Sequence, residues 1–369
     1  MAKFRQLFVA VFVLLTILNA HLGYAATRHR AELAFVANQS SNNISAYQIS
    51  SNGGLLPLAG SPFAAGNAPN SIAVVPSGTF MYVANVVSGD ISGYSVSQTG
   101  ALSPLPGSPF PASTGSAFLT IDPSGRFLYA LNCGSICSST GSGAVLGYTI
   151  DQHTGALTPM SGSPFSAGQF PFAMAVEATG HFAYVANYGS GDVYAYTIDG
   201  QTGALTQNGL PIASGTRPLS VASDPWGQFI YVANTGSNNV SVFGINFDGS
   251  LHSVNGSPFT VGNSVAAVTA SRSGQYIIVA ASAGAYVYQV ASTGALHLTA
   301  PPVAAGTGPN AVSIDPTDSY AYVVNGGSAN VSAYGFNAQT GKLTPVTGSP
   351  FAAGAFAAAV STAPVPTHQ

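Results

Sequence analysis

The sequence has 369 residues, of which only 5% are charged, and its formal net charge is −3. An average globular protein carries about 25% charged residues, so the surface of this chain must consist mainly of Gly, Ser, Thr, Asn and Gln. The scarcity of Lys and Arg excludes the basic surface of a nucleic-acid-binding protein. The hydrophobic fraction of 46% excludes a disordered chain, because enough apolar side chains are present to fill a core.

The first element in chain order is a short basic and apolar segment. Lys3 and Arg5 precede the apolar run of residues 7–20, and small residues lead to Ala25. This order is typical of a secretory signal peptide that is cleaved after Ala25. The alternative is a membrane anchor, but the run is short for a bilayer, and no later apolar run reaches the ~18 residues that a span requires. We therefore predict a signal peptide over residues 1–25, one domain over residues 26–369 without a membrane span, and a secreted or periplasmic protein.

The rest of the sequence repeats the tetrad Tyr-Val-Ala-Asn. The tetrad is complete at Tyr82–Asn85, Tyr184–Asn187 and Tyr231–Asn234, and degenerate copies follow the same pattern elsewhere. The fourth residues of the seven copies are Asn38, Asn85, Asn132, Asn187, Asn234, Ala281 and Asn325. Their spacings are 47, 47, 55, 47, 47 and 44 residues. Periods in the forties are typical of propeller blades or of helical arrays.

The pattern inside one period excludes helices. Residues 69–110 contain four short apolar segments that are separated by turns rich in Gly and Pro, which predicts four antiparallel strands with the tetrad in the second. Proline recurs in the fourth segment, at Pro57, Pro104, Pro159 and Pro345. Because proline cannot donate to a strand ladder, the fourth strand is expected at the outer edge. Seven copies predict an all-β, seven-bladed β-propeller.

The two ends of the domain predict how the ring closes. The first copy begins with a second strand, residues 33–37, and has no first strand before it. The last residues, 353–361, align with the segment that precedes the second strand in the other copies. We expect this C-terminal strand to join the N-terminal blade as its innermost strand. Such a blade would close the ring from both termini.

The tetrad asparagines stand where the second strand turns into the third. Asn bonds nearby backbone groups in turns and tolerates left-handed dihedral angles. Asn38, Asn85, Asn132, Asn187, Asn234 and Asn325 are therefore interpreted as structural turn residues. The alternative is a ring of ligand-binding asparagines, but a binding site seldom needs the same residue in six blades.

With its YVAN repeats and seven blades, the sequence resembles the YVTN-repeat propellers and the seven-bladed lactonase family, which includes 6-phosphogluconolactonases. The resemblance covers the whole domain. It implies a site of Arg, His and Glu on the face where the second strands end, here called the top face, with a Pro-Arg-His triplet at the start of an innermost strand. The matching triplets are Pro69-Asn70-Ser71, Pro171-Phe172-Ala173, Pro218-Leu219-Ser220 and Pro309-Asn310-Ala311. They contain no Arg and no His, so the catalytic residues of the family are not carried over.

Two departures from the repeat map to the top face. Arg217 stands where other blades have Ala68 and Gly308, and the insertion over residues 133–143 contains the only two cysteines of the chain. Cys133 and Cys137 predict a disulfide, because export places them in an oxidising compartment. Arg217, Asn70, Phe172 and Asn310 are the candidate ligand-binding residues around the axial mouth. The guanidinium predicts an anionic ligand, although a solvated loop Arg is the alternative.

Three functions are compatible with these features. The first is a non-catalytic binding or interaction module, whose partner is a small anionic molecule or an extracellular partner. The second is a lactone hydrolase with a rearranged site, and the third is a cell-surface adhesive or matrix component. We predict a monomer with no cofactor, no metal and no nucleic-acid partner.

Glu177 and His181 fall on the opposite face and are interpreted as surface residues, while Asp122, Asp224 and Asp315 are interpreted as turn residues.

Overall fold

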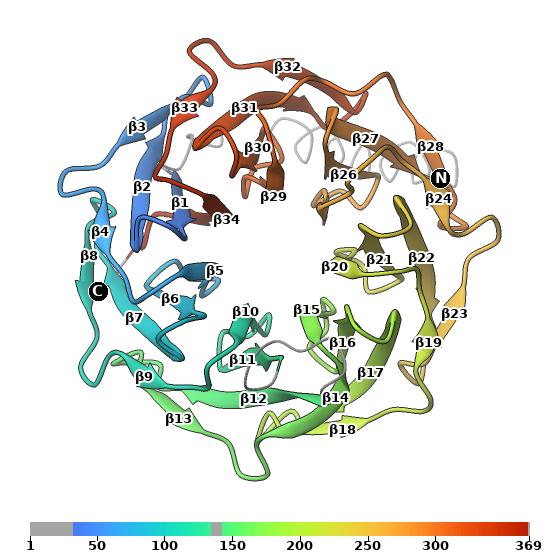
Figure 1. The fold of residues 1–369 in the computed structure, drawn as a ribbon, viewed down its shortest axis with the longest axis horizontal. Coiled ribbons are helices and arrows are strands. Elements are labelled where there is room, and N and C mark those ends of the chain that lie inside the picture. Colours follow the sequence, from blue (N-terminus) through green and yellow to red (C-terminus); the bar gives the residue numbers. More distant parts are fainter. Residues whose placement is uncertain (1–31, 134–141, 368–369) are drawn as a thin grey trace, which may run out of the picture. The chain divides into compact units, whose positions relative to one another are not determined.

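The computed structural model describes residues 32–133 and 142–367, and this part of the chain forms seven antiparallel sheets around an axis (Figure 1). The predicted all-β, seven-bladed propeller is confirmed. The predicted signal peptide, residues 1–25, lies outside the described residues. None of the described residues belongs to a helix that is long and apolar enough to cross a bilayer.

Blade one contains strands from both ends of the domain. Its main strand order is β3 (Leu55–Pro57), β2 (Asn43–Ile49), β1 (Glu32–Asn38) and β34 (Ala357–Pro364), and the short strand β4 (Phe63–Ala64) also pairs with β2. The strands β1 and β34 are antiparallel, with Glu32 opposite Pro364 and Ala37 opposite Ala359. Figure 1 shows the blue β1 beside the red β34. The predicted closure by the C-terminal strand is therefore confirmed.

The other six blades follow one another along the chain, each with its first strand nearest the axis. Blade two consists of β5 (Pro69–Val74), β6 (Phe80–Asn85), β7 (Asp90–Val96), β8 (Leu102–Pro104) and β9 (Phe110–Pro111). Blade three consists of β10 (Ser116–Ile121), β11 (Phe127–Asn132), β12 (Ser142–Ile150), β13 (Leu157–Pro159) and β14 (Phe165–Gln169). Blade four consists of β15 (Pro171–Val176), β16 (Phe182–Asn187), β17 (Asp192–Ile198), β18 (Leu205–Gln207) and β19 (Ile212–Ala213). Blade five consists of β20 (Pro218–Ser223), β21 (Phe229–Asn234), β22 (Asn239–Ile245), β23 (Leu251–Ser253) and β24 (Phe259–Thr260). Blade six consists of β25 (Ala267–Ala270), β26 (Tyr276–Ala281), β27 (Gly284–Val290) and β28 (Leu296–Leu298). Blade seven consists of β29 (Pro309–Ile314), β30 (Tyr320–Asn325), β31 (Asn330–Asn337), β32 (Lys342–Pro345) and β33 (Phe351–Ala352).

A fifth short strand completes every blade except blade six, and the sequence pattern did not predict it. In blade two the segment Gly107-Ser108-Pro109-Phe110 turns the chain back, so that β9 pairs with the first residues of β7. The hydroxyl of Ser108 accepts a hydrogen bond of 2.9 Å from the backbone N–H of Gly93 in the same strand. The fifth strand is only two residues long here, which is too short to give an alternating pattern in the sequence.

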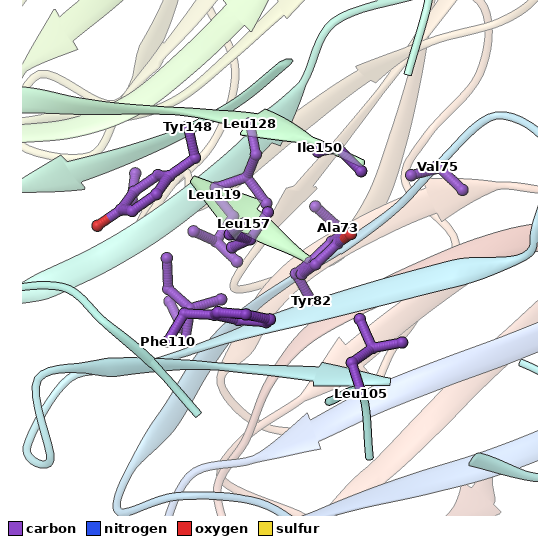
Figure 2. Packing of buried hydrophobic residues seen from close by; sticks show 13 residues of the cluster. Ala73, Val75, Tyr82, Leu105, Phe110, Leu119, Leu128, Tyr148, Ile150 and Leu157 are labelled. Carbon is purple, nitrogen blue, oxygen red and sulfur yellow. The ribbon is translucent and has the colours of Figure 1, made fainter. Parts of the chain in front are cut away.

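The core lies between neighbouring blades, and each of the seven interfaces has its own buried cluster within the described residues. Figure 2 shows the cluster between blades two and three, where Tyr82 and Ala73 face Leu119 and Leu128. Tyr82 and Leu128 are fully buried. The second strand of a blade is thus covered on both faces, which explains why the tetrads are almost entirely apolar.

The tetrad tyrosines connect one blade to the next. The hydroxyl of Tyr184 in blade four donates a 2.9 Å hydrogen bond to the carbonyl oxygen of Gly249 in the turn between the third and fourth strands of blade five. Gly249 has a φ of +81°, and a Cβ added there would lie 2.1 Å from the ring of Phe182. Tyr82, Tyr129 and Tyr322 make the equivalent bond to Gly155, Gly203 and Gly53. Tyrosine and the turn glycine therefore form one repeated contact.

Two tyrosines provide a matched test of this contact. We expect Tyr184→Phe to lower the free energy of unfolding by about 1–3 kcal/mol, because the buried carbonyl oxygen of Gly249 loses its donor. Tyr231→Phe should be neutral or stabilising, since the buried hydroxyl of Tyr231 has no hydrogen-bond partner. Urea unfolding of both variants measures the difference. Equal losses in the two variants would show that the hydroxyl contributes nothing to the contact between blades.

Candidate functional site

The antiparallel order of the strands defines two faces of the ring. The tetrads end on the top face, where the loops between second and third strands lie together with the segments that enter the innermost strands. The turns between first and second strands and between third and fourth strands lie on the opposite face, here called the bottom face. Each loop residue can therefore be assigned to a face from its place in the blade.

The innermost strands of the seven blades surround an axial cavity of about 370 Å³. Three of the candidate ligand-binding residues, Asn70, Phe172 and Asn310, line this cavity, and so does Leu219. In each case the preceding proline pairs with the tetrad Asn of the second strand, and the pairing register then shifts by one residue. Each of the four residues stands at this β-bulge. Such bulges change the direction of a side chain, and this accounts for the repeated position of the four residues at the axis.

The polar side chains of the cavity connect neighbouring innermost strands. The amide of Asn310 donates to the carbonyl oxygen of Ala357 at 3.1 Å. The hydroxyl of Ser71 accepts from the N–H of Leu119 at 3.0 Å, and Ser220 accepts from Val268 at 3.2 Å. The remaining lining side chains are apolar apart from Asn70, and none of the lining residues in the described part of the chain is charged or a histidine.

Arg217 lies at the rim of the top face and is not among the residues that line the cavity. Its side chain is exposed, and its guanidinium carbon lies 5.9 Å from the ring centroid of Tyr188. The ring of Tyr188 contacts Phe170 at 5.0 Å and Phe172 at 6.2 Å between centroids. These four residues, Phe170, Phe172, Tyr188 and Arg217, are called the aromatic rim below. Phe172 connects the rim to the cavity.

Phe170 and Tyr188 were not predicted from the sequence, although Phe170 left a signal in the repeat. Phe170 and Arg217 occupy the position just before the innermost strand, where the backbone has a positive φ of 49° and 55°. Ala68 and Gly308 occupy the same position in other blades, with φ of 56° and 62°. A large side chain at a position that favours glycine is unusual. This departure from the repeat could have indicated the rim.

Five of the six tetrad asparagines are fully buried inside the blades, and the sixth, Asn132, is partly buried. Asn234 is fully buried, and its amide nitrogen donates to Asn239 at 2.9 Å and to Ser241 at 3.0 Å. Its amide oxygen accepts from the N–H of Gly215 at 3.2 Å. Asn38 makes the equivalent bonds in blade one. These contacts join the second strand, the third strand and the entering segment of one blade, and no tetrad asparagine is among the cavity-lining residues.

The predicted Cys133–Cys137 disulfide involves a residue outside the described part of the chain. Cys133 itself is fully buried at the end of β11. Cys137 lies between the two described segments, so the disulfide stays a prediction. No group of three or more metal-binding side chains occurs among the residues that the structure describes.

The sequence matches the family described as "Lactonase, 7-bladed beta-propeller" over residues 19–112, 110–207, 176–266 and 250–357. The chain belongs to this lactonase family. A search of curated proteins finds no match.

Solved structures show the same fold as this lactonase-family chain at low sequence identity. A proposed 6-phosphogluconolactonase from Bacteroides uniformis is 16% identical, with a TM-score of 0.75, and covers 91% of this chain and 100% of its own. A proposed 6-phosphogluconolactonase from Bacteroides fragilis is 18% identical, with a TM-score of 0.74 and coverages of 91% and 99%. The periplasmic gluconolactonase of Pseudomonas aeruginosa is 16% identical, with a TM-score of 0.72 and coverages of 91% and 99%.

Proposed function

We propose that this lactonase-family propeller binds a sugar lactone, or a closely similar uncharged ring, in its axial cavity without hydrolysing it. A volume of about 370 Å³ is within the ordinary range for small-molecule sites. The rings of Phe170, Phe172 and Tyr188 offer apolar faces on which a ligand ring can pack. Family membership supports the lactone class of ligand, because the described name of the family is that of lactone-hydrolysing enzymes.

The observation that carries this proposal is the uncharged lining of the cavity. Hydrolysis of a lactone requires a general base or an activated water, together with a donor that stabilises the developing oxyanion. Among the described lining residues there is no carboxylate and no imidazole, and Ser71, Ser220 and Asn310 already bond to the neighbouring strands. These side chains can position a ring, but they offer no group that could remove a proton from water.

Lactone hydrolysis is the second candidate function. The family match and the names of the similar structures favour it. In that case a group outside the described cavity lining would have to supply the base. Arg217 then serves as the cation that meets an anionic substituent of the ligand, such as a phosphate or a carboxylate, at the rim. We also propose export of the protein, which the composition of residues 1–25 supports.

One pair of measurements distinguishes the two functions. We expect gluconolactam, a ring that does not hydrolyse, to bind in calorimetry, and δ-gluconolactone to open no faster with the protein than without it. Ala358→Trp fills the cavity with a large side chain at a lining position, and should weaken lactam binding by more than about tenfold at unchanged secondary structure. Ala266→Trp, at a lining position in blade six, provides a second filled variant if the first does not fold.

Two results contradict the proposal. Turnover of the lactone above the uncatalysed rate, lost in the filled variants, would establish hydrolysis in the cavity. Binding of the lactam that survives both filled variants would place the ligand elsewhere on the protein.

A further inference from the structure

A second cavity, of about 470 Å³, lies on the bottom face between blades four and five. Blade four contributes Glu177, Thr179, His181 and Phe182, and blade five contributes Gly227 and Phe247. We call it the bottom-face groove. It lies at the opposite end of the blades from the aromatic rim, so it is separate from the proposed lactone site.

The carboxylate of Glu177 determines which nitrogen of His181 carries the proton. Glu177 is 2% exposed and accepts hydrogen bonds from the N–H groups of Thr179 at 2.7 Å and His181 at 2.8 Å. The hydroxyl of Thr179 lies 2.6 Å from Glu177 Oε1 and 2.8 Å from His181 Nδ1. An ionised carboxylate only accepts, so the single hydroxyl hydrogen points to Glu177 and His181 donates from Nδ1. In this tautomer Nε2 is left as a hydrogen-bond acceptor, and the side chain of His181 is exposed.

Two carboxylates lie in or beside the groove, those of Glu177 and Asp248. Asp248 follows the groove residue Phe247, and hydrogen bonds from the side chain and backbone of Ser250 lower the pKa of its carboxyl. Burial raises the pKa of Tyr184, and the nearby carboxylates of Glu177 and Asp248 raise it further, so both anions act on the same region. No Lys or Arg is among the described residues that line the groove. A ligand here would meet negative potential and hydrogen-bond acceptors.

The groove also has an exposed aromatic wall. The side chain of Phe247 is fully exposed, at 104% of the reference value. Phe182 lines the same groove and is partly buried against Gly249. The face of an aromatic ring attracts a cation, and the attraction is modest at exposed sites.

The equivalent place between blades three and four contains a cation of the chain itself. Arg126 occupies the position of His181, and its guanidinium carbon lies 4.8 Å from the ring centroid of Phe127, the equivalent of Phe182. The guanidinium also donates to the carbonyl oxygen of Gly200 in the next blade. Between blades four and five the aromatic ring is kept as Phe182, and the carboxylate of Asp122 is replaced by that of Glu177. The position of the Arg126 guanidinium is taken by the imidazole of His181.

From these observations we propose that the bottom-face groove binds an organic ammonium ion. The primary amine donates to Nε2 of His181, its charge is balanced by Glu177 and Asp248, and its carbon chain packs on Phe247. The ligand thereby occupies the place that Arg126 fills one blade earlier.

The test uses butylammonium chloride and 1-pentanol, two molecules of similar shape that differ in charge. We expect calorimetry and the His181 ring signals in NMR to show saturable binding of butylammonium and much weaker binding of pentanol. Phe247→Ala should weaken butylammonium binding about fivefold. His181→Arg, which restores the arrangement of blade three, should abolish it. Leu210→Ala, at another highly exposed apolar position, serves as the control and should bind as the parent does.

Three outcomes would overturn the proposal. Equal affinity for pentanol and butylammonium would show an apolar groove without selectivity for charge. Unchanged binding in both Phe247→Ala and His181→Arg would place the ammonium ion elsewhere. The absence of saturable binding of butylammonium to the folded parent would show that no such site exists.

Discussion

A chain that ends at Gly354 should lose cooperative unfolding and aggregate. This truncation removes β34, which pairs with β1 along its whole length in blade one. The side chains of Phe35 and Val36 in β1 are fully buried, and the loss of the innermost strand would expose this part of the sheet. An unpaired strand edge of apolar residues is a template for aggregation. The loss also removes the contacts of β34 with β5 and β29 in the two neighbouring blades.

The matched control is a chain that ends at Val365, because it keeps all of β34. Thermal unfolding followed by circular dichroism and by light scattering compares the two truncations with the parent. A synthetic peptide of residues 355–367, added during refolding, should restore part of the cooperative transition to the shorter chain. If the chain that ends at Gly354 melts as the parent does, the ring does not depend on its closing strand.

The sequence was sufficient for the architecture because the repeat encodes it several times. Seven tetrads determined the number of blades, and the prolines of the fourth segments marked the outer strands, as Pro57 at the end of β3 and Pro104 at the end of β8 show. The closing strand followed from a count, since the first copy lacked a first strand. The fifth strands were missed because a pair of residues such as Phe63–Ala64 carries no periodicity of its own.

The candidate site was only partly accessible from the sequence. The repeat register placed Asn70, Phe172 and Asn310 at the starts of innermost strands, and these residues line the axial cavity. The direction of the Arg217 side chain was not predictable, because it depends on the ring of Tyr188 in the preceding blade. A contact between blades involves residues that are far apart in the sequence, and no spacing rule within one repeat describes it.

The bottom-face groove illustrates the same limit. Glu177 and His181 were interpreted as surface residues, since a lone acid and a lone imidazole at a turn usually have no further role. This was wrong for Glu177, which is buried because its carboxylate bonds the backbone of its own turn. The structure adds Thr179 between them and Phe247 from the next blade. The hydroxyl bridge could be suspected from the spacing of the three residues in one turn, whereas Phe247, 66 residues after His181 in the chain, could not.

A buried carboxyl group on the bottom face should make stability depend on pH. Glu32, at the start of β1, is 6% exposed and hydrogen-bonds to the carboxylate of Asp315 in blade seven. Burial, followed by the bond and charge of Asp315, raises the pKa of Glu32 to about 8 from its ordinary value of 4.5, while Arg272 acts in the opposite direction. Burial raises the pKa of Tyr320 and of Tyr322, and the charges of Asp315 and Glu32 raise both further. Glu32 is therefore protonated in the folded protein at neutral pH and ionised in the unfolded chain.

The sign of the effect follows from these two pKa values. The contribution of Glu32 to the free energy of unfolding is fully present below about pH 4.5, decreases as the pH rises, and is lost above about pH 8. We expect the free energy of unfolding to fall on the order of 3 kcal/mol between about pH 5 and pH 9, after a discount for solvent screening. Glu32→Gln, which keeps a donor toward Asp315 and cannot ionise, should remove this part of the pH dependence and be the more stable form at about pH 9. Urea unfolding of both proteins across this range provides the measurement. If the two curves fall in parallel, another group is responsible, and Glu32 is already ionised in the folded protein.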